Sequence, residues 1–263
     1  MTSLPVVPSN LLPAKGGSGF GVSYYRRAAL CTRAFHLDRG LEAADQPLPT
    51  SDSALRGIYF HSMAEAYYGG KEYVRQQSDV GNLVSEANAW WASYSEAQPG
   101  RDFFGEVVGV ELPISGYVRG VPTSGRVDLV VRTTKDSVAR LERAGAYGTQ
   151  PGEVWLIDHK TKGSRRDMGA FAHSAQFILY NYLYHQQEGV QPAGTIVNVI
   201  IGTKTPQFEK IIVPRPNEAQ IKGVLDWIER TALLAATTNT PNYAACDLFG
   251  TCSHLTSGRC NRL

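Results

Sequence analysis

Val154-Trp155-Leu156-Ile157-Asp158-His159-Lys160 is the stretch that decides how this sequence is interpreted. Its four consecutive apolar residues follow a glycine, which is typical of a buried central strand. Side chains alternate between faces along a strand, so Asp158 and Lys160 point one way and His159 the other. An acid and a base therefore share one face at the end of a buried strand. They form either an ion pair of the fold or part of a functional site.

The elements predicted around this strand change from helical to extended and back. Apolar residues at helical spacing predict helices, and β-branched alternating runs predict strands. The predicted helices are residues 55–68, 82–97 and 171–188, one from Ser23 (its N-cap) and one from Asn217; the predicted strands are 104–114, 125–132, 154–157, 195–202 and 208–213. Turns are expected at Gly116 and 120–122, and a loop at 40–53. This order predicts an α/β fold with a central mixed β-sheet flanked by helices.

Length and composition exclude several classes of protein. The chain has 263 residues, 43% hydrophobic, and its 26 basic and 24 acidic residues give a net charge of +2. That balance excludes a histone-like wrapper and an acidic tail, although a local basic patch stays possible. With no apolar run of eighteen residues and no signal peptide at the start, we expect no membrane span and a cytoplasmic location. We expect residues 1–22 to be an irregular lead-in and 23–263 a single domain, with 55–98 a helical insertion.

Asp128 lies inside the apolar run Gly125–Val131, where an unpaired carboxylate is expensive to bury. If Asp128 lies beside Asp158 on an adjacent strand, their repulsion also requires a cation. A divalent metal would both compensate the buried Asp128 carboxylate and offset its repulsion with Asp158. Oxygen ligands suit Mg²⁺ or Mn²⁺. The alternative is that Asp128 pairs with Arg126, its neighbour on the same face.

Three further residues complete the candidate set. His61 lies on a predicted helix, where a lone histidine is usually an ordinary polar contact. Gln176 and Tyr180 are four residues apart on another predicted helix and therefore share a face. Each is unremarkable alone, but together with the two aspartates they form an ordered series of four motifs. The motifs are Gly57-x-x-x-His61, Gly125-x-x-Asp128, Asp158-x-Lys160 and Gln176-x-x-x-Tyr180.

This series resembles the RecB-like branch of the PD-(D/E)XK nuclease superfamily, from about Ser23 to Cys260. Asp158 stands where many relatives have Glu. The resemblance implies a restriction-endonuclease-like core and a metal-dependent DNA exonuclease. Its substrate would be single-stranded DNA or DNA ends, in recombination, repair or phage DNA processing. The alternatives are an endonuclease and a non-hydrolytic module that binds DNA ends.

The resemblance also implies a role for each residue. His61, Asp128, Asp158 and the backbone carbonyl of His159 would hold Mg²⁺ or Mn²⁺, and Glu111 is a further candidate ligand. Lys160 would orient the attacking water, since nearby carboxylates keep an ammonium group charged. Gln176 and Tyr180 would contact the DNA backbone or the nucleophile.

The four cysteines, Cys31, Cys246, Cys252 and Cys260, have the one-plus-three layout of family members that carry a [4Fe–4S] cluster. Such a cluster requires four thiolates. The spacing C-x5-C-x7-C departs from the tighter arrangement of those relatives, so Zn²⁺ and unligated core cysteines are the alternatives. A cluster would tie residue 31 to the segment 246–260 and stabilise the fold.

Basic residues form two groups that can grip phosphates without reading sequence. One follows the central strand and the other surrounds Cys31; their members are Lys162, Arg165 and Arg166, and Arg26, Arg27 and Arg33. Tyr24, Tyr25 and Phe35 near the second group are either packing residues or platforms for unpaired bases. A homo-oligomer or a recombination or repair partner is a further possibility.

Overall fold

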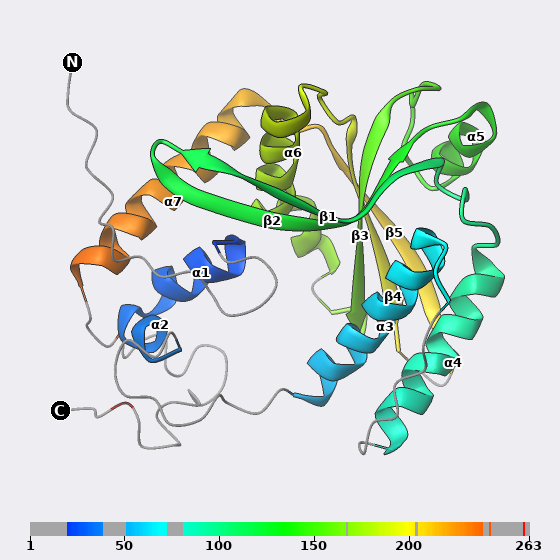
Figure 1. The fold of residues 1–263 in the computed structure, drawn as a ribbon, viewed down its shortest axis with the longest axis horizontal. Coiled ribbons are helices and arrows are strands. Elements are labelled where there is room, and N and C mark those ends of the chain that lie inside the picture. The colour runs from blue at the N-terminus through cyan, green and yellow to red at the C-terminus, as the bar shows by residue number, and fades with distance from the viewer. Residues whose placement is uncertain are drawn as a thin grey trace. The chain divides into compact units, whose positions relative to one another are not determined.

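The protein is described by a computed structural model that covers residues 20–38, 51–72, 81–166, 168–202 and 205–238, with 242 and 260. Seven α-helices, a short 3-10 helix and five strands lie within these residues (Figure 1). The helices are α1 Val22–Leu30, α2 Thr32–Asp38, α3 Asp52–Gly69, α4 Gly81–Ala97, α5 Lys135–Arg143, α6 Ala175–Glu188 and α7 Glu218–Thr237, and the 3-10 helix is η1 Met168–His173. The strands are β1 Glu106–Val118, β2 Val121–Arg132, β3 Val154–Lys162, β4 Gly194–Ile201 and β5 Gln207–Pro214. Within these residues, no helix has the length and apolar character needed to cross a bilayer.

The five strands form one mixed sheet in the order β1-β2-β3-β4-β5. β3 runs parallel to β4, whereas β2 is antiparallel to β3 and β5 to β4. Leu129 lies opposite Ile157, so the adjacent positions Asp128 and Asp158 are neighbours across the β2–β3 pair. The α/β fold predicted from the sequence is confirmed, and its strand register joins the two aspartates.

The sheet carries a separate core on each face because alternate side chains of its strands point in opposite directions. On one face Phe60 of α3 and Tyr94 of α4 pack with Ile157 of β3. On the other face Phe177 of α6 packs with Val197 of β4. Figure 1 shows α3 and α4 crossing the same side of the sheet. Asp158 and Lys160 therefore start from a strand that is packed on both faces.

The chain divides into two compact units. One comprises residues 50–112 and 126–216, and holds most of the sheet with α3 to α6. The other comprises residues 1–49, 113–125 and 217–263. In this second unit Arg119 of the β1–β2 turn lies 2.5 Å from Asp226 and 2.7 Å from Glu229 of α7.

Several predicted boundaries were wrong. Gly116 lies inside β1, and the turn falls at Arg119 and Gly120, whose φ values of 49° and 84° suit a tight hairpin. The first helix has Gly21, not Ser23, as its N-cap. The sixth helix begins after the Ser174 cap, with η1 before it.

One helix was not predicted, and two predicted irregular segments fall mostly outside the described residues. Helix α5 was missed by sequence reasoning, although Thr134 and Ser137 form a capping box at its start. The predicted lead-in and the loop at 40–53 lie almost entirely outside the described residues.

Candidate active site

Helix α3 brings His61 to the sheet through a close approach at Gly57. A Cβ at Gly57 would lie 3.2 Å from the Thr161 hydroxyl oxygen, so the small residue lets the helix lie against the end of β3. The helix starts at a Ser51 cap, whose side chain accepts a hydrogen bond from the Ala54 amide. His61 follows Gly57 by about one helical turn and so points toward the same strands.

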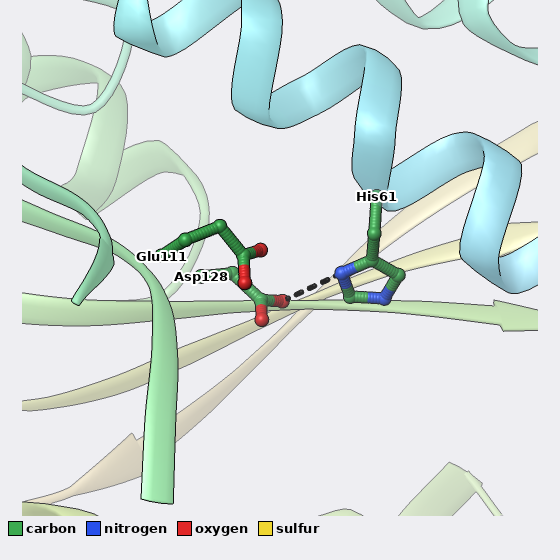
Figure 2. Close-up of side chains that lie close together, drawn as sticks. All are labelled: His61, Glu111 and Asp128. Carbon is green, nitrogen blue, oxygen red and sulfur yellow. Dashed lines mark ion pairs between the residues drawn. The ribbon is translucent and has the colours of Figure 1, made fainter. Parts of the chain in front are cut away.

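His61, Glu111 and Asp128 form a group that can hold a metal ion, here called the His–Glu–Asp group. One ligand atom from each residue lies within 4.8 Å of the others. Figure 2 shows the three side chains converging from α3, β1 and β2, with His61 Nδ1 3.4 Å from Asp128 Oδ2. One imidazole nitrogen and two carboxylates form a donor set that suits a hard divalent cation, so these residues fit Mg²⁺ or Mn²⁺.

The backbone at Glu111, the β1 member of this group, has an unusual conformation. Its φ of 48° lies in the left-handed region, which non-glycine residues seldom adopt inside a strand. In a regular strand, residues that face the core are two positions apart. Val107 and Val110 of β1 both pack on the core although they are three positions apart, so the alternation is interrupted between them. A strand that changes phase redirects a side chain, as β-bulges do near active sites. The nearby Gly109 and Pro113 were the available sequence signal for this irregularity.

Asp158 and Lys160 form a second pair next to the His–Glu–Asp group. Lys160 Nζ lies 2.7 Å from Asp158 Oδ2, and the Asp158 side chain is only 3% exposed. Gln176 Nε2 donates a 3.1 Å hydrogen bond to the other oxygen, Asp158 Oδ1. The amide of His159 donates a 2.6 Å hydrogen bond to Asp128 Oδ2, so the Asp158–Lys160 strand also holds Asp128 in place.

Burial and crowding of carboxylates raise the pKa values of two acids in the group. Burial is the main cause for Asp128, and the nearby Asp158 adds to it. The pKa of Glu111 rises to about 7, from burial first and then from Asp128. Burial lowers the pKa of His61, and Lys160 lowers it further. A raised carboxyl pKa marks an excess of buried negative charge, which a bound cation would offset.

Lys160 is the cation that partly balances these acids. Burial alone lowers its pKa, but Asp158 and Asp128 outweigh burial and the net pKa is raised. Lys160 is therefore an ammonium group at neutral pH. Tyr180 is 6% exposed and close enough to Asp158 and Lys160 for both to affect its pKa, which burial raises.

A buried polar network lies on the opposite face of β3, and sequence reasoning missed it. Asn198 Nδ2 lies 3.2 Å from His159 Nδ1 and 3.1 Å from the Tyr94 hydroxyl. The Tyr94 and Tyr68 hydroxyls are 2.6 Å apart. Burial lowers the pKa of His159 to about 3, so its ring is neutral. The available signal was Asn198 itself, a lone amide in an otherwise apolar buried strand.

Three arginines considered in the sequence prediction form ion pairs with acidic side chains. Arg126 lies 3.6 Å from Glu111, so the alternative pairing with Asp128 is not the one observed. Arg165 pairs with Glu209 at 2.6 Å. In the other unit Arg27 pairs with Asp38 at 2.6 Å.

The aromatic residues proposed as base platforms are core residues. Tyr24, Tyr25 and Phe35 are each no more than 2% exposed, so they are not available for stacking. Cys31 and Cys260 are buried, whereas Cys246 and Cys252 lie outside the described residues.

The chain is similar to known proteins in its sequence profile and in its fold. The profile of the PD-(D/E)XK nuclease superfamily matches residues 20–260. The crystal structure of a "putative exonuclease" from Eubacterium rectale has a TM-score of 0.59 and 14% identity, covering 93% of this chain and 89% of that one. The structure of SSO0001 is also 14% identical, covering 86% of this chain and 93% of that one, with a TM-score of 0.38. The search of curated proteins gave no match.

The fold, the ordered motifs and the profile match together identify the protein superfamily to which this chain belongs. A match over nearly the whole chain means that this protein belongs to the PD-(D/E)XK nuclease superfamily. The likeness to the E. rectale structure shows a shared fold. Members of this superfamily are nucleases that use divalent metals, and the His–Glu–Asp group can hold such an ion.

Proposed function

We propose that this chain is an Mg²⁺- or Mn²⁺-dependent DNA exonuclease of the RecB-like branch, acting on single-stranded DNA or DNA ends. The observation that carries the proposal is the convergence of His61, Glu111 and Asp128 beside the Asp158–Lys160 pair. Acids alone can occur together without a metal, but here a fixed ammonium group lies next to them. That combination suits hydrolysis of a phosphodiester, in which negative charge builds up on the phosphate.

Each residue has a part that follows from its surroundings. His61, Glu111 and Asp128 would hold the cation, and Asp158 and the His159 carbonyl complete the predicted ligand set. The cation, when bound, lowers the pKa of a coordinated water and screens the phosphate charge. Lys160 stays protonated, so it orients water and offsets charge instead of accepting a proton. Gln176 fixes the Asp158 carboxylate. Tyr180, which the resemblance assigns to the DNA backbone or the nucleophile, is buried beside Asp158 and Lys160.

The test is degradation of single- and double-stranded DNA that carries a label at the 5′ or the 3′ end. We expect Mn²⁺ or Mg²⁺ to support stepwise shortening from an end and EDTA to stop it. Lys160→Ala should abolish cleavage. Lys71→Ala is the matched control, since this exposed lysine lies just beyond the far end of α3. Removal of one charge-stabilising group of this kind costs roughly a hundredfold in rate or more.

The other outcomes separate the alternatives. If the wild type and Lys160→Ala both bind DNA and leave it intact, the chain is a non-hydrolytic DNA-end-binding module. Cleavage of circular single-stranded DNA would instead identify an endonuclease. Equal activity of Lys160→Ala and the wild type would reject the proposed role of the Asp158–Lys160 pair.

The [4Fe–4S] cluster on Cys31, Cys246, Cys252 and Cys260 stays a prediction from the sequence. Burial of Cys31 and Cys260 is compatible with it, and Cys31 Sγ accepts 3.4 Å hydrogen bonds from the backbone amides of Ala34 and Asn242. Protein purified without air should be brown if the cluster is present. A colourless protein that contains zinc would support the Zn²⁺ alternative. Oligomeric assembly, a repair partner and a cytoplasmic location also stay predictions.

A further inference from the structure

A pocket of about 560 Å³ lies within the unit that contains the candidate active site. It is lined by the end of β3 at Thr161 and Lys162, by Gly202 just after β4, and by Trp90 of α4. β3 and β4 are parallel, and the carboxyl ends of parallel strands are where α/β folds commonly bind ligands.

The pocket and the candidate active site share strand β3 and helix α3. Lys162 follows Lys160 by two residues on the same face of β3, which is about 7 Å along the strand. On the helix side, Arg56 lines the pocket and precedes His61 by five residues on α3. Trp90 packs on the face of the sheet that carries Ile157, opposite that of Lys160, so a strand of DNA whose phosphate lies at Lys160 would pass the end of β3 to place a neighbouring nucleotide in the pocket.

The indole of Trp90 is held against the sheet by a glycine. A Cβ at Gly202 would lie 1.9 Å from Trp90 Cζ2, which no side chain could tolerate without displacing the ring. Trp90 is half-buried, with its inner part packed on the core of the sheet. The ring therefore lies against Gly202 and lines the pocket, and an aromatic ring is what stacking on a base requires.

The polar groups of the pocket favour a base over a phosphate. Arg56 Nε lies 2.5 Å from Glu86 Oε2, so these two charges largely cancel. Lys162 adds one positive charge at the rim; it lies 5.3 Å from the centre of the Phe171 ring and contacts the Arg166 carbonyl. A paired carboxylate would repel a phosphate, whereas an ion pair beside an indole can hydrogen-bond the edge of a base and stack on its face.

We infer that this pocket binds one unpaired base of single-stranded DNA, stacked on Trp90, next to the nucleotide at the cleavage site. This inference rests on the proposed nuclease function and adds a base-binding subsite to it. It predicts that the enzyme prefers unpaired DNA, because a paired base cannot enter. It predicts no strong sequence preference, because every base has a face that can stack.

The experiment is an abasic scan with the full-length chain. Short single-stranded oligonucleotides carry one abasic site at successive positions from the end, and binding is measured by fluorescence anisotropy in EDTA. For the wild type we expect one abasic position to weaken binding about tenfold, the size of a lost base–aromatic stack. Trp90→Ala should weaken binding of intact DNA by a similar factor and remove the dependence on that position. Trp90→Phe should restore much of it.

Two glycines give a matched pair of variants. Gly202→Ala should displace the indole and behave like Trp90→Ala. Gly223→Ala changes a glycine of α7 that does not line the pocket and whose Cβ would meet nothing within 4 Å, so binding should not change. With Mn²⁺ present, Trp90→Ala should raise KM about tenfold and leave kcat nearly unchanged, which a general folding defect would not do.

The experiments distinguish a failure of the base-pocket inference from a failure of the nuclease proposal. If the wild type degrades DNA while the abasic scan is flat and Trp90→Ala keeps the wild-type KM, the base pocket is wrong and the nuclease proposal stands. If the scan shows one sensitive position but no DNA is cleaved with Mn²⁺ or Mg²⁺, the pocket stands and the hydrolytic function fails. If Gly223→Ala weakens binding as much as Gly202→Ala, the effect comes from replacing a glycine in general and not from the indole.

Discussion

Replacing Lys160 with Met tests the energetics of the Asp158–Lys160 pair. The substitution keeps the length of the side chain but removes the ammonium group 2.7 Å from Asp158 Oδ2. Asp158 is 3% exposed, so its carboxylate would lose its nearest cation without gaining water. Removal of one partner of a buried pair costs about 3–5 kcal/mol. Because the Lys160 side chain is 29% exposed, we expect the lower end, about 3 kcal/mol.

The assay is urea unfolding in EDTA at pH 8, which measures the free energy of unfolding without metal. The pKa of Lys160 is raised in the folded protein, so its contribution is fully present at all pH values below the unfolded pKa of 10.5. Added Mn²⁺ should reduce the deficit of Lys160→Met.

The double variant Asp158→Asn/Lys160→Met is the control for this prediction. The amide oxygen introduced at position 158 can still accept the hydrogen bond from Gln176, and no buried charge is left unpaired there. We expect the double variant to be more stable than Lys160→Met alone. With the single variant Asp158→Asn, it completes a double-mutant cycle, for which we expect a coupling free energy of about 2 kcal/mol. A loss of less than about 0.5 kcal/mol for Lys160→Met, or a double variant that is no more stable than it, would refute this reasoning.

Three other outcomes follow from the site and the sheet. Without metal, the melting temperature should fall as the pH rises from about 4 to about 8, because the raised pKa values of Asp128 (about 8) and Glu111 (about 7) mean that the folded state binds more protons than the unfolded state in that range; Asp128→Asn should flatten the curve. Mn²⁺ at a hundred times its Kd should stabilise the wild type by about 2.7 kcal/mol, measured as a thermal shift, and His61→Ala should lose most of that gain. Gly194→Ala should prevent stable folding, seen as loss of the cooperative unfolding transition, because its Cβ would lie 2.4 Å from the Val213 carbonyl oxygen; an unchanged transition would contradict the close approach of β4 to β5.

The predictions that succeeded rest on local patterns. The run 154–157 is apolar on both faces, and a strand with that pattern has to be central, as β3 is. A helix was predicted from Asn217, and Asn217 and Gln220 form a capping box at the start of α7. These signals succeed because propensity, pattern and burial agree within a few residues.

Some alternatives could not be decided from the sequence, because they depend on contacts that spacing does not encode. Tyr24 and Phe35 could be packing residues or base platforms, and their rings meet edge to face at 4.7 Å inside the protein, so they are packing residues. Trp90 packs on the core of the sheet. What the sequence could not indicate is that Gly202, more than a hundred residues later, leaves the ring at the rim of a pocket.

Glu111 shows most directly why the site needed the structure. A strand with regular alternation would place residues 107, 109 and 111 on one face, and nothing in the charge pattern distinguishes this glutamate from an ordinary partner of Arg126. The left-handed φ of 48° at Glu111 interrupts that alternation and turns its carboxylate toward Asp128 and His61. Such a backbone costs about 1–2 kcal/mol for a non-glycine residue. A strained residue persists where its surroundings hold it, and here strain and a raised carboxyl pKa occur at the same side chain, which is the combination that a metal ligand would produce.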